Sequence, residues 1–537
     1  MLYMKLKSIN KFVIGCALVV TAASCAKKLD LFPQNELTQQ NAYANAAGYK
    51  SVLAKIYGNM ASTGNAGPAG ASDIQGLDEG SQSPFIRGFF NAQELPTDEA
   101  IVAWDDQTIK DFHGLRFTSS DPFLLGLYNR LIYNVAVGNE YLREATDAKL
   151  SSRGISGADA TEIKKTAAEV RFLRAFNYWA MMDLFGKSTF LNESDPVGTL
   201  PGQKTRAELF TYIETELKAI ETELAPAKTI EYGRVDQAAA WALLARMYLN
   251  AGVYTGTPKY TEAITYAKKV IAAGYTLRPS YSSLFMADND KQKDEFIYAI
   301  NCDGLRTKSF GNTSFLVHAP AGDNAAEYGI GGGWYGYRTT KQFAALFADQ
   351  TGNTDKRAMF TNLGNQEIAD VGQFMQGVQV KKFRNIRTDG LPVSDAQNKE
   401  FADIDFPVFR LAEMYLIYTE AHLRGGAGGD AVTALAYMNA IRFRAYAQSF
   451  GPGNVGQLSA GNLNLQTVLD ERGRELYWEG HRRTDLIRYG QLTTGTYLWQ
   501  WKGGVASGTS VNDKYNIFPI PATVRSANPN LEQNTGY

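Results

Sequence analysis

Hydrophobic residues recur at helical spacing in separate blocks of the chain. Ala238–Ala251 and Tyr260–Ala273 place apolar or small residues three and four positions apart, which predicts two amphipathic helices. The first block also carries the tetratricopeptide pattern W-x2-L-G-x2-Y, with Ala in the Gly position: Trp241, Leu244, Ala245 and Tyr248. Ala263 and Ala267 supply the small positions of the partner helix. Small residues at these spacings let two helices pack closely, so this repeat is a scaffold and not a chemical site.

Three further segments extend the helical pattern. Ala431–Ala445 is helical and follows a second, looser version of the repeat signature at Val408, Leu411, Ala412 and Tyr415. Glu162–Phe185 and Arg206–Leu224 have helical periodicity with weaker signatures. The pattern predicts a mainly α fold, a tetratricopeptide-like helical-repeat scaffold.

Two long segments between these blocks have a different composition. Residues 62–120 and 301–405 are rich in Gly and aromatic residues, and they contain short apolar runs such as Ser314–Val317 and Val378–Phe383. We interpret them as loop and short-strand insertions, longer than the connections of most compact domains. Long ordered loops on a rigid frame commonly carry binding function, so we expect the binding surface there.

The N-terminus has the pattern of an export signal. Three basic residues, Lys5, Lys7 and Lys11, precede the apolar stretch Phe12–Ala23, which is shorter than the roughly 20 residues of a membrane span. Small residues then lead to Cys25, as in a lipobox, although Ala22 stands where Leu is usual. We predict a lipoprotein signal peptide over residues 1–24 and acylation of Cys25. An ordinary cleaved signal with an incidental cysteine is the alternative.

Charge and cysteine content exclude several classes of protein. Without the leader, 51 basic and 55 acidic residues remain, and this net charge of −4 gives no footprint for nucleic acid. Cys16 leaves with the leader and Cys25 is the predicted anchor, so Cys302 has no disulfide partner and is expected to be a buried thiol. No later segment is long and apolar enough to span a membrane.

Catalytic and metal-binding motifs are missing from the sequence. The four histidines are scattered and none has zinc-site spacing: His113, His318, His422 and His481. Neither a G-x-S-x-G elbow nor a Walker loop is present. Gly331, Gly333 and Gly336 satisfy G-x-G-x-x-G, but Trp334 and Tyr335 fill the space that a pyrophosphate needs. We interpret this run as an aromatic loop.

Acidic doublets leave one enzymatic alternative open. Three of them cluster in the first insertion, at Asp78-Glu79, Asp98-Glu99 and Asp105-Asp106. A glycosidase would hold two carboxylates roughly 5–9.5 Å apart across a sugar, whereas acidic doublets in polar loops are usually solvated turn residues. Spacing predicts no metal site or other cofactor, although a structural calcium near Asp288 and Asp290 is possible because acidic turns can hold that ion.

Several motifs in a fixed order carry a family resemblance. They are RFLRAFNYWAMMDLFG (171–186), ALLARMYLNAGVYTG (242–256), LFMADND (284–290), DFPVFRLAEMYLIYTEA (405–421), ERGRELYWEGHRRTDLIRYG (471–490), NIFPIPATV (516–524) and NPNLEQNTGY (528–537). On these motifs the chain resembles the SusD/RagB outer-membrane lipoproteins over essentially its full length. Segments 77–80, 91–104 and 497–504 are most similar to the starch-binding founding member of that family.

The resemblance implies a fold, a location and a partner. It implies a helical scaffold whose insertions form the binding surface, and a lipid-anchored position exposed at the outer membrane of the cell. It also implies a SusC-like TonB-dependent transporter over which the protein sits as a lid. The charged residues of the motifs are expected to form scaffold ion pairs: Arg171, Glu413, Glu420, Glu471, Arg472, Glu479, Arg482 and Asp485.

The resemblance also implies a glycan site. One face of a pyranose ring stacks on aromatic side chains, and its hydroxyls need short polar partners. The expected site residues are the stacking rings Trp104 and Trp334, Phe310 in place of a Tyr, the hydrogen-bonding residues Arg87 and Asp78, and Gln107 in place of a shorter amide. The two tryptophans and Phe310 could instead be core residues, and Arg87 and Asp78 could simply pair and pin their loop.

We therefore expect a glycan-binding lipoprotein without catalytic activity. Its expected ligand is starch or maltooligosaccharide, captured at the cell surface and passed to the transporter. A SusD-like binder of another glycan or of a peptide is the first alternative. The second, from a different class, is a surface glycosidase that uses the acids of residues 98–106.

Overall fold

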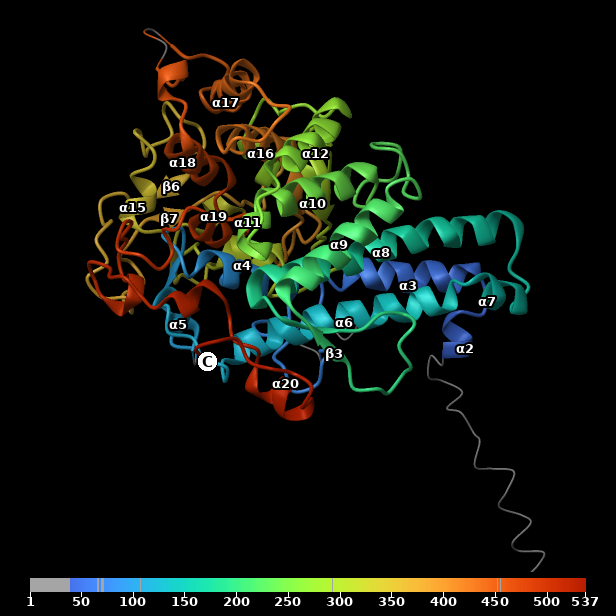
Figure 1. Ribbon diagram of the computed structural model, residues 1–537. Coiled ribbons are helices and arrows are strands. Elements are labelled where there is room, and N and C mark those ends of the chain that lie inside the picture. Colours follow the sequence, from blue (N-terminus) through green and yellow to red (C-terminus); the bar gives the residue numbers. More distant parts are fainter. Residues whose placement is uncertain are drawn as a thin grey trace, which may run out of the picture.

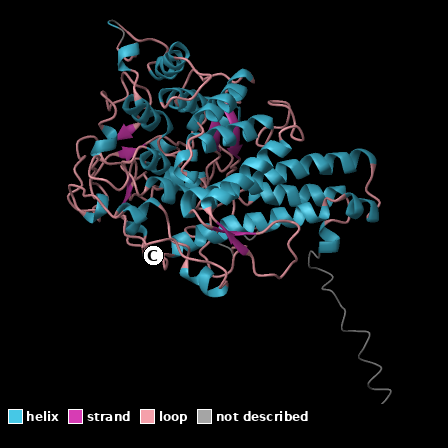
Figure 2. Cartoon of the chain, viewed as in Figure 1, coloured by secondary structure: helices cyan, strands magenta, loops and turns pink. Residues whose placement is uncertain are grey.

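The computed structural model describes residues 39–64, 67–68, 72–106, 108–291, 293–451, 453 and 455–537. The predicted signal peptide, Cys25 and Gln107 lie outside the described residues. Helices dominate the described part, and strands are few and short (Figure 2). The expectation of a mainly α fold is confirmed.

The elements follow one another along the chain as follows. The α-helices are α2 (Gln39–Ala42), α3 (Ala46–Gly58), α4 (Phe85–Glu94), α5 (Ile109–His113), α6 (Pro122–Glu144), α7 (Asp147–Ser152), α8 (Gly157–Phe185), α9 (Arg206–Ile220), α10 (Gln237–Leu249), α11 (Ala251–Thr255), α12 (Tyr260–Ala272), α13 (Thr313–His318), α14 (Ala325–Tyr328), α15 (Lys341–Ala344), α16 (Leu411–Leu423), α17 (Ala431–Ala445), α18 (Leu465–Leu476), α19 (Arg482–Arg488) and α20 (Ala522–Ala527). The strands are β1 (Ile101–Val102), β2 (Ser188–Phe190), β3 (Gly202–Lys204), β4 (Phe296–Ile300), β5 (Tyr337–Arg338), β6 (Phe360–Thr361), β7 (Gln379–Val380) and β8 (Phe406–Arg410). Short 3-10 helices occur at η1 (Ser282–Phe285), η2 (Asn289–Lys291), η4 (Ala460–Asn462), η5 (Lys502–Gly504) and η6 (Asp513–Asn516).

Long helices form two connected groups. The first comprises α3, α6, α8 and α9, with α8 packed against each of the other three (Figure 1). Side-chain caps fix where these helices begin. Asp121 accepts from the Phe123 and Leu124 amides at 2.9 Å at the start of α6, and Thr205 with Glu208 forms a capping box on α9.

The second group is the tetratricopeptide-like stack of α10, α12, α16 and α17. Helices α10 and α12 pack together as the repeat pattern predicts, with Ala263 and Ala267 fully buried between neighbours. α12 also packs on α16, and α16 on α17 (Figure 1). Val408, which the looser signature included, belongs to β8, the strand that pairs with β4, and α16 begins only at Leu411. Phe406, Val408 and Phe409 favour a strand at that point, although Pro407 lies among them.

The insertions are less loop-like than their composition suggests. Within 62–120, all ten residues of α4 are buried, because Phe85, Ile86, Phe89 and Phe90 recur at helical spacing and pack into the core. Within 301–405, the run Ser314–Val317 is helical in α13, where the Asn312 side chain caps the Ser314 amide. Val378–Phe383 does contain a strand, β7. The described strands pair only two by two and antiparallel: β1 with β5, β2 with β3, β4 with β8, and β6 with β7.

Buried ion pairs join α18 and α19 to the rest of the fold. Glu475 of α18 meets Arg357, Arg410 and Arg444, and every one of these residues is buried. Burial alone raises the pKa of the Glu475 carboxyl, but the three arginines lower it to about 2. Each of the eight charged residues that the resemblance assigned to scaffold ion pairs has an oppositely charged partner within 4 Å, which confirms that assignment.

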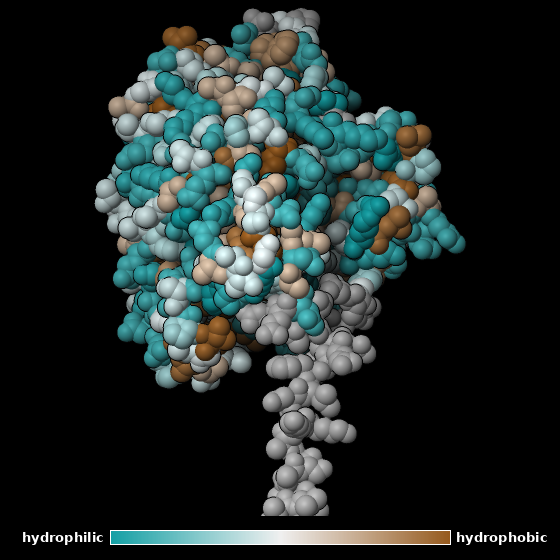
Figure 3. Space-filling view, turned by 90° about the vertical axis from the view of Figure 1, so that its right-hand side faces the viewer, coloured by the Kyte–Doolittle hydropathy of each residue, from teal (hydrophilic) through white to brown (hydrophobic). Residues whose placement is uncertain are grey.

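Polar residues dominate the face of the molecule that Figure 3 shows. Hydrophobic residues form small separate groups on it. Among the described residues, no helix combines the length and hydropathy that a bilayer span requires. Cys302 is a buried free thiol, as its lack of a partner predicts.

Candidate functional site

Both insertions meet at the small sheet formed by β1 and β5. Ile101 pairs with Arg338 and Val102 with Tyr337, and the Ala103 amide donates to the Gly336 carbonyl at 2.9 Å. Trp104 follows β1 and Trp334 precedes β5, so this pairing brings together two rings that are 230 positions apart in the sequence. Their centroids lie 6.4 Å apart and their planes are inclined by 49°.

The two indoles line an open hollow of about 370 Å³. The other lining residues are Arg87, Asp105, Asp106 and Phe374. Both tryptophans are half-buried, so part of each ring faces solvent while the remainder is held by packing. A hollow that combines tilted aromatic faces with a guanidinium and carboxylates has the composition of a sugar-binding surface.

Glycines of the aromatic loop are needed for close packing. Gly336 has a φ of +105°, and a Cβ there would lie 2.2 Å from Nε1 of Trp104. A Cβ on Gly333 would lie 2.2 Å from the Ala321 carbonyl oxygen. Glycine is therefore required at Gly333 and Gly336, because neighbouring groups occupy the space that a side chain would need. At Gly336 the neighbouring group is the Trp104 indole.

His318 supports the Trp334 ring from behind. The two rings stack with centroids 4.9 Å apart, and the Trp334 amide donates to the His318 carbonyl at 2.9 Å. The imidazole nitrogens lie 2.7 and 2.8 Å from the carbonyl oxygens of Gly332 and Glu400. Burial lowers the pKa of His318, and the two carbonyls offset part of that shift. This role could not be predicted from the sequence, because a lone histidine has no diagnostic spacing.

Arg87 forms the base of the hollow. It lies in the first turn of α4, and its guanidinium carbon is 5.4 Å from the Trp104 ring centroid and 4.8 Å from that of Phe315. Its Nη1 donates to the Gly80 carbonyl at 3.0 Å, whereas its buried Nε has no acceptor among the described residues. Burial lowers the pKa of Arg87, and the nearby Tyr337 and Asp106 offset this in part.

Asp78 and Phe310 lie beside the hollow, outside its lining. Oδ1 of Asp78 accepts from the amides of Gly80 and Ser81, at 3.0 and 2.6 Å, which makes a tight turn. No ion pair joins Asp78 to Arg87 in the described part of the chain. Phe310 is half-buried with its ring centroid 6.1 Å from that of Trp334. The glycan-contact role of all six predicted residues stays a prediction.

Phe374 is a lining residue that the sequence analysis missed. It is 40% exposed and sits in the loop between β6 and β7. Arg338 holds this loop, because its Nε donates to the Gln376 carbonyl at 2.7 Å and its Nη2 to the Val371 carbonyl at 3.2 Å. A phenylalanine between glutamine and methionine has no sequence signal of its own. Phe374 lines the hollow with the two tryptophans because Arg338 of β5 holds its loop there.

The acids of residues 98–106 are unevenly placed. Asp98 is buried and accepts two bonds of 2.8 Å from Arg482, and Glu99 is buried with its carboxylate 3.0 Å from the Trp478 amide. These two carboxylates belong to the core, which leaves Asp105 and Asp106 as the exposed acids of the hollow.

Asp288, one of the two residues suggested near a calcium ion, forms hydrogen bonds within the protein. The Asp288 carboxylate accepts from the Thr388 amide at 2.9 Å and from its hydroxyl at 2.5 Å. Among the described residues, no group of three or more acidic, histidine or cysteine side chains could hold a metal ion. The calcium remains a prediction.

Comparison with known proteins identifies the family. The sequence profile of the SusD family matches residues 331–537. The starch-binding protein SusD of Bacteroides thetaiotaomicron is 34% identical over 585 aligned positions, which cover 99% of this chain and 100% of that protein. The chain belongs to the SusD family.

Solved structures share the fold of this SusD-family protein. A SusD superfamily protein from Parabacteroides distasonis superposes with a TM-score of 0.67 at 22% identity, over 94% of this chain and all of that one. A laminarin-binding SusD-like protein superposes with a TM-score of 0.65 at 20% identity, over 92% of this chain and all of that one. At these identities the likeness establishes the fold alone.

Proposed function

We propose that this SusD-family protein is a non-catalytic, surface-anchored glycan binder that captures starch or maltooligosaccharides. One observation carries the proposal: Trp104 and Trp334 are tilted by 49° around an open hollow with Arg87 at its base. Consecutive glucose units of a helical α-glucan turn relative to one another, so a curved pair of platforms suits them better than parallel rings. Relatedness to a protein named for starch binding supports the same ligand.

Anchoring and delivery complete the proposal. The leader and Cys25 support an acylated N-terminus at the outer membrane, and family membership supports a SusC-like TonB-dependent transporter as partner. A lid over a barrel needs an interface well above roughly 1,000 Å². Mild detergent extraction should then co-purify a large barrel with this chain, and Cys25→Ala should release the protein into the soluble fraction. Recovery of the protein alone under several mild conditions argues against the lid.

A second glycan is a specific rival. One structural relative is named for laminarin binding, and its backbone is as similar to this chain as those of the other relatives. Affinity electrophoresis against amylopectin, laminarin and a fructan separates these ligands. We expect retardation by amylopectin alone. Retardation by laminarin and not by amylopectin would show that the ligand is laminarin and not starch. The assignment of the hollow as the glycan site would be unaffected.

The hydrolase alternative is tested on the same polysaccharide. Asp98 and Glu99 are held in the core by Arg482 and Trp478, so they are not available to a sugar in the hollow. Incubation with amylopectin should produce no new reducing ends. If new reducing ends appear with the wild-type protein and not with Asp106→Asn, the protein is a glycosidase and not a binder.

A further inference from the structure

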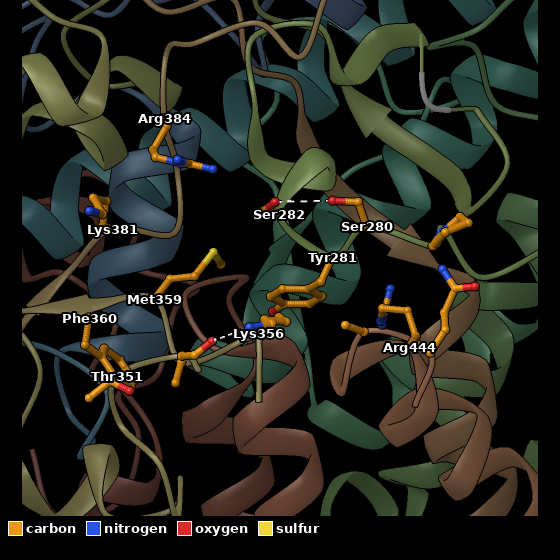
Figure 4. Close-up of a pocket in the computed structure, with 15 residues that line it drawn as sticks. Ser280, Tyr281, Ser282, Thr351, Lys356, Met359, Phe360, Lys381, Arg384 and Arg444 are labelled. Atoms are coloured by element: carbon orange, nitrogen blue, oxygen red, sulfur yellow. Dashed lines mark hydrogen bonds between the residues drawn. The ribbon is translucent and has the colours of Figure 1, made fainter. Parts of the chain in front are cut away.

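A second cavity of about 580 Å³ lies away from the aromatic hollow and shares none of its lining residues. Its walls come from four separate parts of the fold. They are the segment before η1, the loop leading into β6, the segment after β7 and the C-terminal end of α17. Figure 4 shows side chains from these walls around a common open space. The cavity therefore depends on the whole fold and not on one loop.

Cations line this cavity without any acid. Its charged lining residues are Lys356, Lys381, Arg384 and Arg444. Arg444 is neutralised by Glu295 and Glu475, and Lys381 by Glu327. No carboxylate of the described residues lies within ion-pair distance of Arg384 or Lys356. The cavity thus has two cationic side chains that form no direct ion pair with the described residues.

Arg384 has hydrogen-bond donors to spare. It is half-buried, its Nη2 has only the thioether of Met286 as a partner at 3.5 Å, and its buried Nε has no acceptor in the described part of the protein. In Figure 4 its guanidinium extends from one wall towards Ser282. A buried donor without an acceptor costs free energy, and an anion would satisfy two such donors at once through a bidentate contact.

Lys356 approaches the same space from below. Its Nζ donates to the carbonyls of Gly352 and Asn353, at 3.0 and 2.7 Å, which leaves one of its three N–H groups for a ligand. In Figure 4 it lies across the open space from Arg384. Lysine and arginine therefore face one cavity from opposite sides.

The remaining lining suits a polar ring more than a bare ion. The lining also includes the hydroxyl residues Ser280, Ser282 and Thr351 and the rings of Tyr281 and Phe360. The Thr351 hydroxyl donates to Asp349 at 2.5 Å, and the two serine hydroxyls lie 3.3 Å from each other. The wall from α17 ends in Ala447 and Gln448, whose φ values of +53° and +62° are strained for residues other than glycine. Such strain persists only where the surroundings impose it, and here it shapes the wall of the cavity.

We propose that this cavity is a second ligand site, for a small sugar that carries an oxyanion as a carboxylate or a sulfate group. Arg384 binds the anion, Lys356 adds a second positive charge, and the hydroxyls and rings receive the sugar. This site is independent of the α-glucan hollow, so one protein would bind a neutral chain and an acidic sugar at two places.

Calorimetry with three probes tests the proposal on the mature protein. Glucuronate carries the carboxylate, glucose 6-sulfate carries the sulfate, and glucose is the neutral control. We expect at least one acidic sugar to bind with a Kd in the millimolar range or below, no binding of glucose, and weaker binding as salt is added. Binding of neither acidic sugar would overturn the proposal. If inorganic sulfate binds as tightly as glucose 6-sulfate, the sugar part of the proposal is wrong.

Matched variants locate the binding. Arg384→Gln and Lys356→Gln should each weaken binding of the acidic sugar about tenfold or more, since a charge-assisted hydrogen bond is lost. Arg525→Gln removes an exposed arginine outside the cavity and should change nothing. Thermal melts control for folding. Binding that survives both cavity variants would place the acidic sugar elsewhere and contradict the assignment.

Discussion

Two arginines, Arg410 in the scaffold and Arg87 in the hollow, are both buried but have opposite surroundings. Nε of Arg410 donates to Glu479 at 2.7 Å, its Nη1 to Glu295 and Glu475, and its Nη2 to Glu479 and a main-chain carbonyl. Arg87 has one carbonyl partner and otherwise faces aromatic rings. All three guanidinium nitrogens of Arg410 donate hydrogen bonds within the protein, whereas only one nitrogen of Arg87 does.

The contrast separates structural charge from binding charge. Around Glu475, every charge meets an opposite charge inside the protein, so removing one leaves its partner buried and unpaired. Around Arg87, donors remain for a ligand, and the surrounding rings supply apolar contact. Substitutions in the first region should change stability and leave binding intact, and substitutions in the second should do the reverse.

The largest effect is expected at Glu475. Glu475→Gln leaves Arg357, Arg410 and Arg444 short of a counter-charge and should lower the free energy of unfolding by about 3–5 kcal/mol. Because the folded pKa of about 2 lies below the ordinary 4.5, this carboxylate stabilises above pH 4.5 and loses that contribution as pH falls towards 2. Urea unfolding at pH 6 and pH 3 measures both. A difference between wild type and variant that is as large at pH 3 as at pH 6 would refute the pairing.

The next effect is expected at Gly336, on the binding side of the comparison. In Gly336→Ala the new methyl group collides with the Trp104 indole and must displace it, so α-glucan affinity should fall about thirtyfold, as for loss of a binding hot spot. Gly332→Ala is the matched control, because a Cβ there meets no atom within 4 Å. Calorimetry with maltoheptaose measures both variants. Equal binding by the two would mean that Trp104 does not contact the glycan.

Arg87 should have a smaller effect on binding. Arg87→Gln removes the guanidinium from the base of the hollow and should weaken maltoheptaose about tenfold, from roughly 1.5 kcal/mol for a charge-assisted hydrogen bond. The melting temperature should stay close to that of the wild type, since no carboxylate in the described residues pairs with Arg87. A large fall in melting temperature with intact binding would place Arg87 in the scaffold beside Arg410.

Phe374 should have the smallest effect. A further aromatic contact is worth about 0.5–1.5 kcal/mol, so Phe374→Ala should weaken α-glucan binding a few-fold. Phe443 is 42% exposed on α17, outside the hollow, and Phe443→Ala is the control for losing an exposed ring. If the two variants bind α-glucan with the same affinity, Phe374 does not contact the glycan.

The sequence predicts the scaffold better than the insertions. Periodicity finds α10 and α12 because each helix repeats apolar or small residues along a buried face: Leu244, Ala245 and Tyr248 on α10, and Ala263 and Ala267 on α12. A regular face of this kind needs no information from the rest of the chain. Composition misleads for α4 and α13. Glycine and polar residues surround these two short helices, and their burial depends on contacts with distant segments.

The site shows the same limit. Resemblance points to Trp104, Trp334 and Arg87. The β1–β5 pairing brings the two tryptophans together, and α4 places Arg87 in the same hollow. His318 and Phe374 could not be found in that way. Each acquires its place from a long-range contact, His318 by stacking on Trp334 and Phe374 through the loop that Arg338 holds.

The most direct test compares exposed and buried tryptophans. We expect Trp104→Ala and Trp334→Ala each to weaken maltoheptaose about thirtyfold or more, with melting temperatures close to wild type. Trp478→Ala, at a ring that is 1% exposed, should cost about 3–5 kcal/mol of stability and leave the affinity of the folded protein unchanged. Calorimetry and thermal melts on the three variants measure both quantities. Lowered melting with retained binding in Trp104→Ala and Trp334→Ala would place those rings in the scaffold and contradict the glycan site.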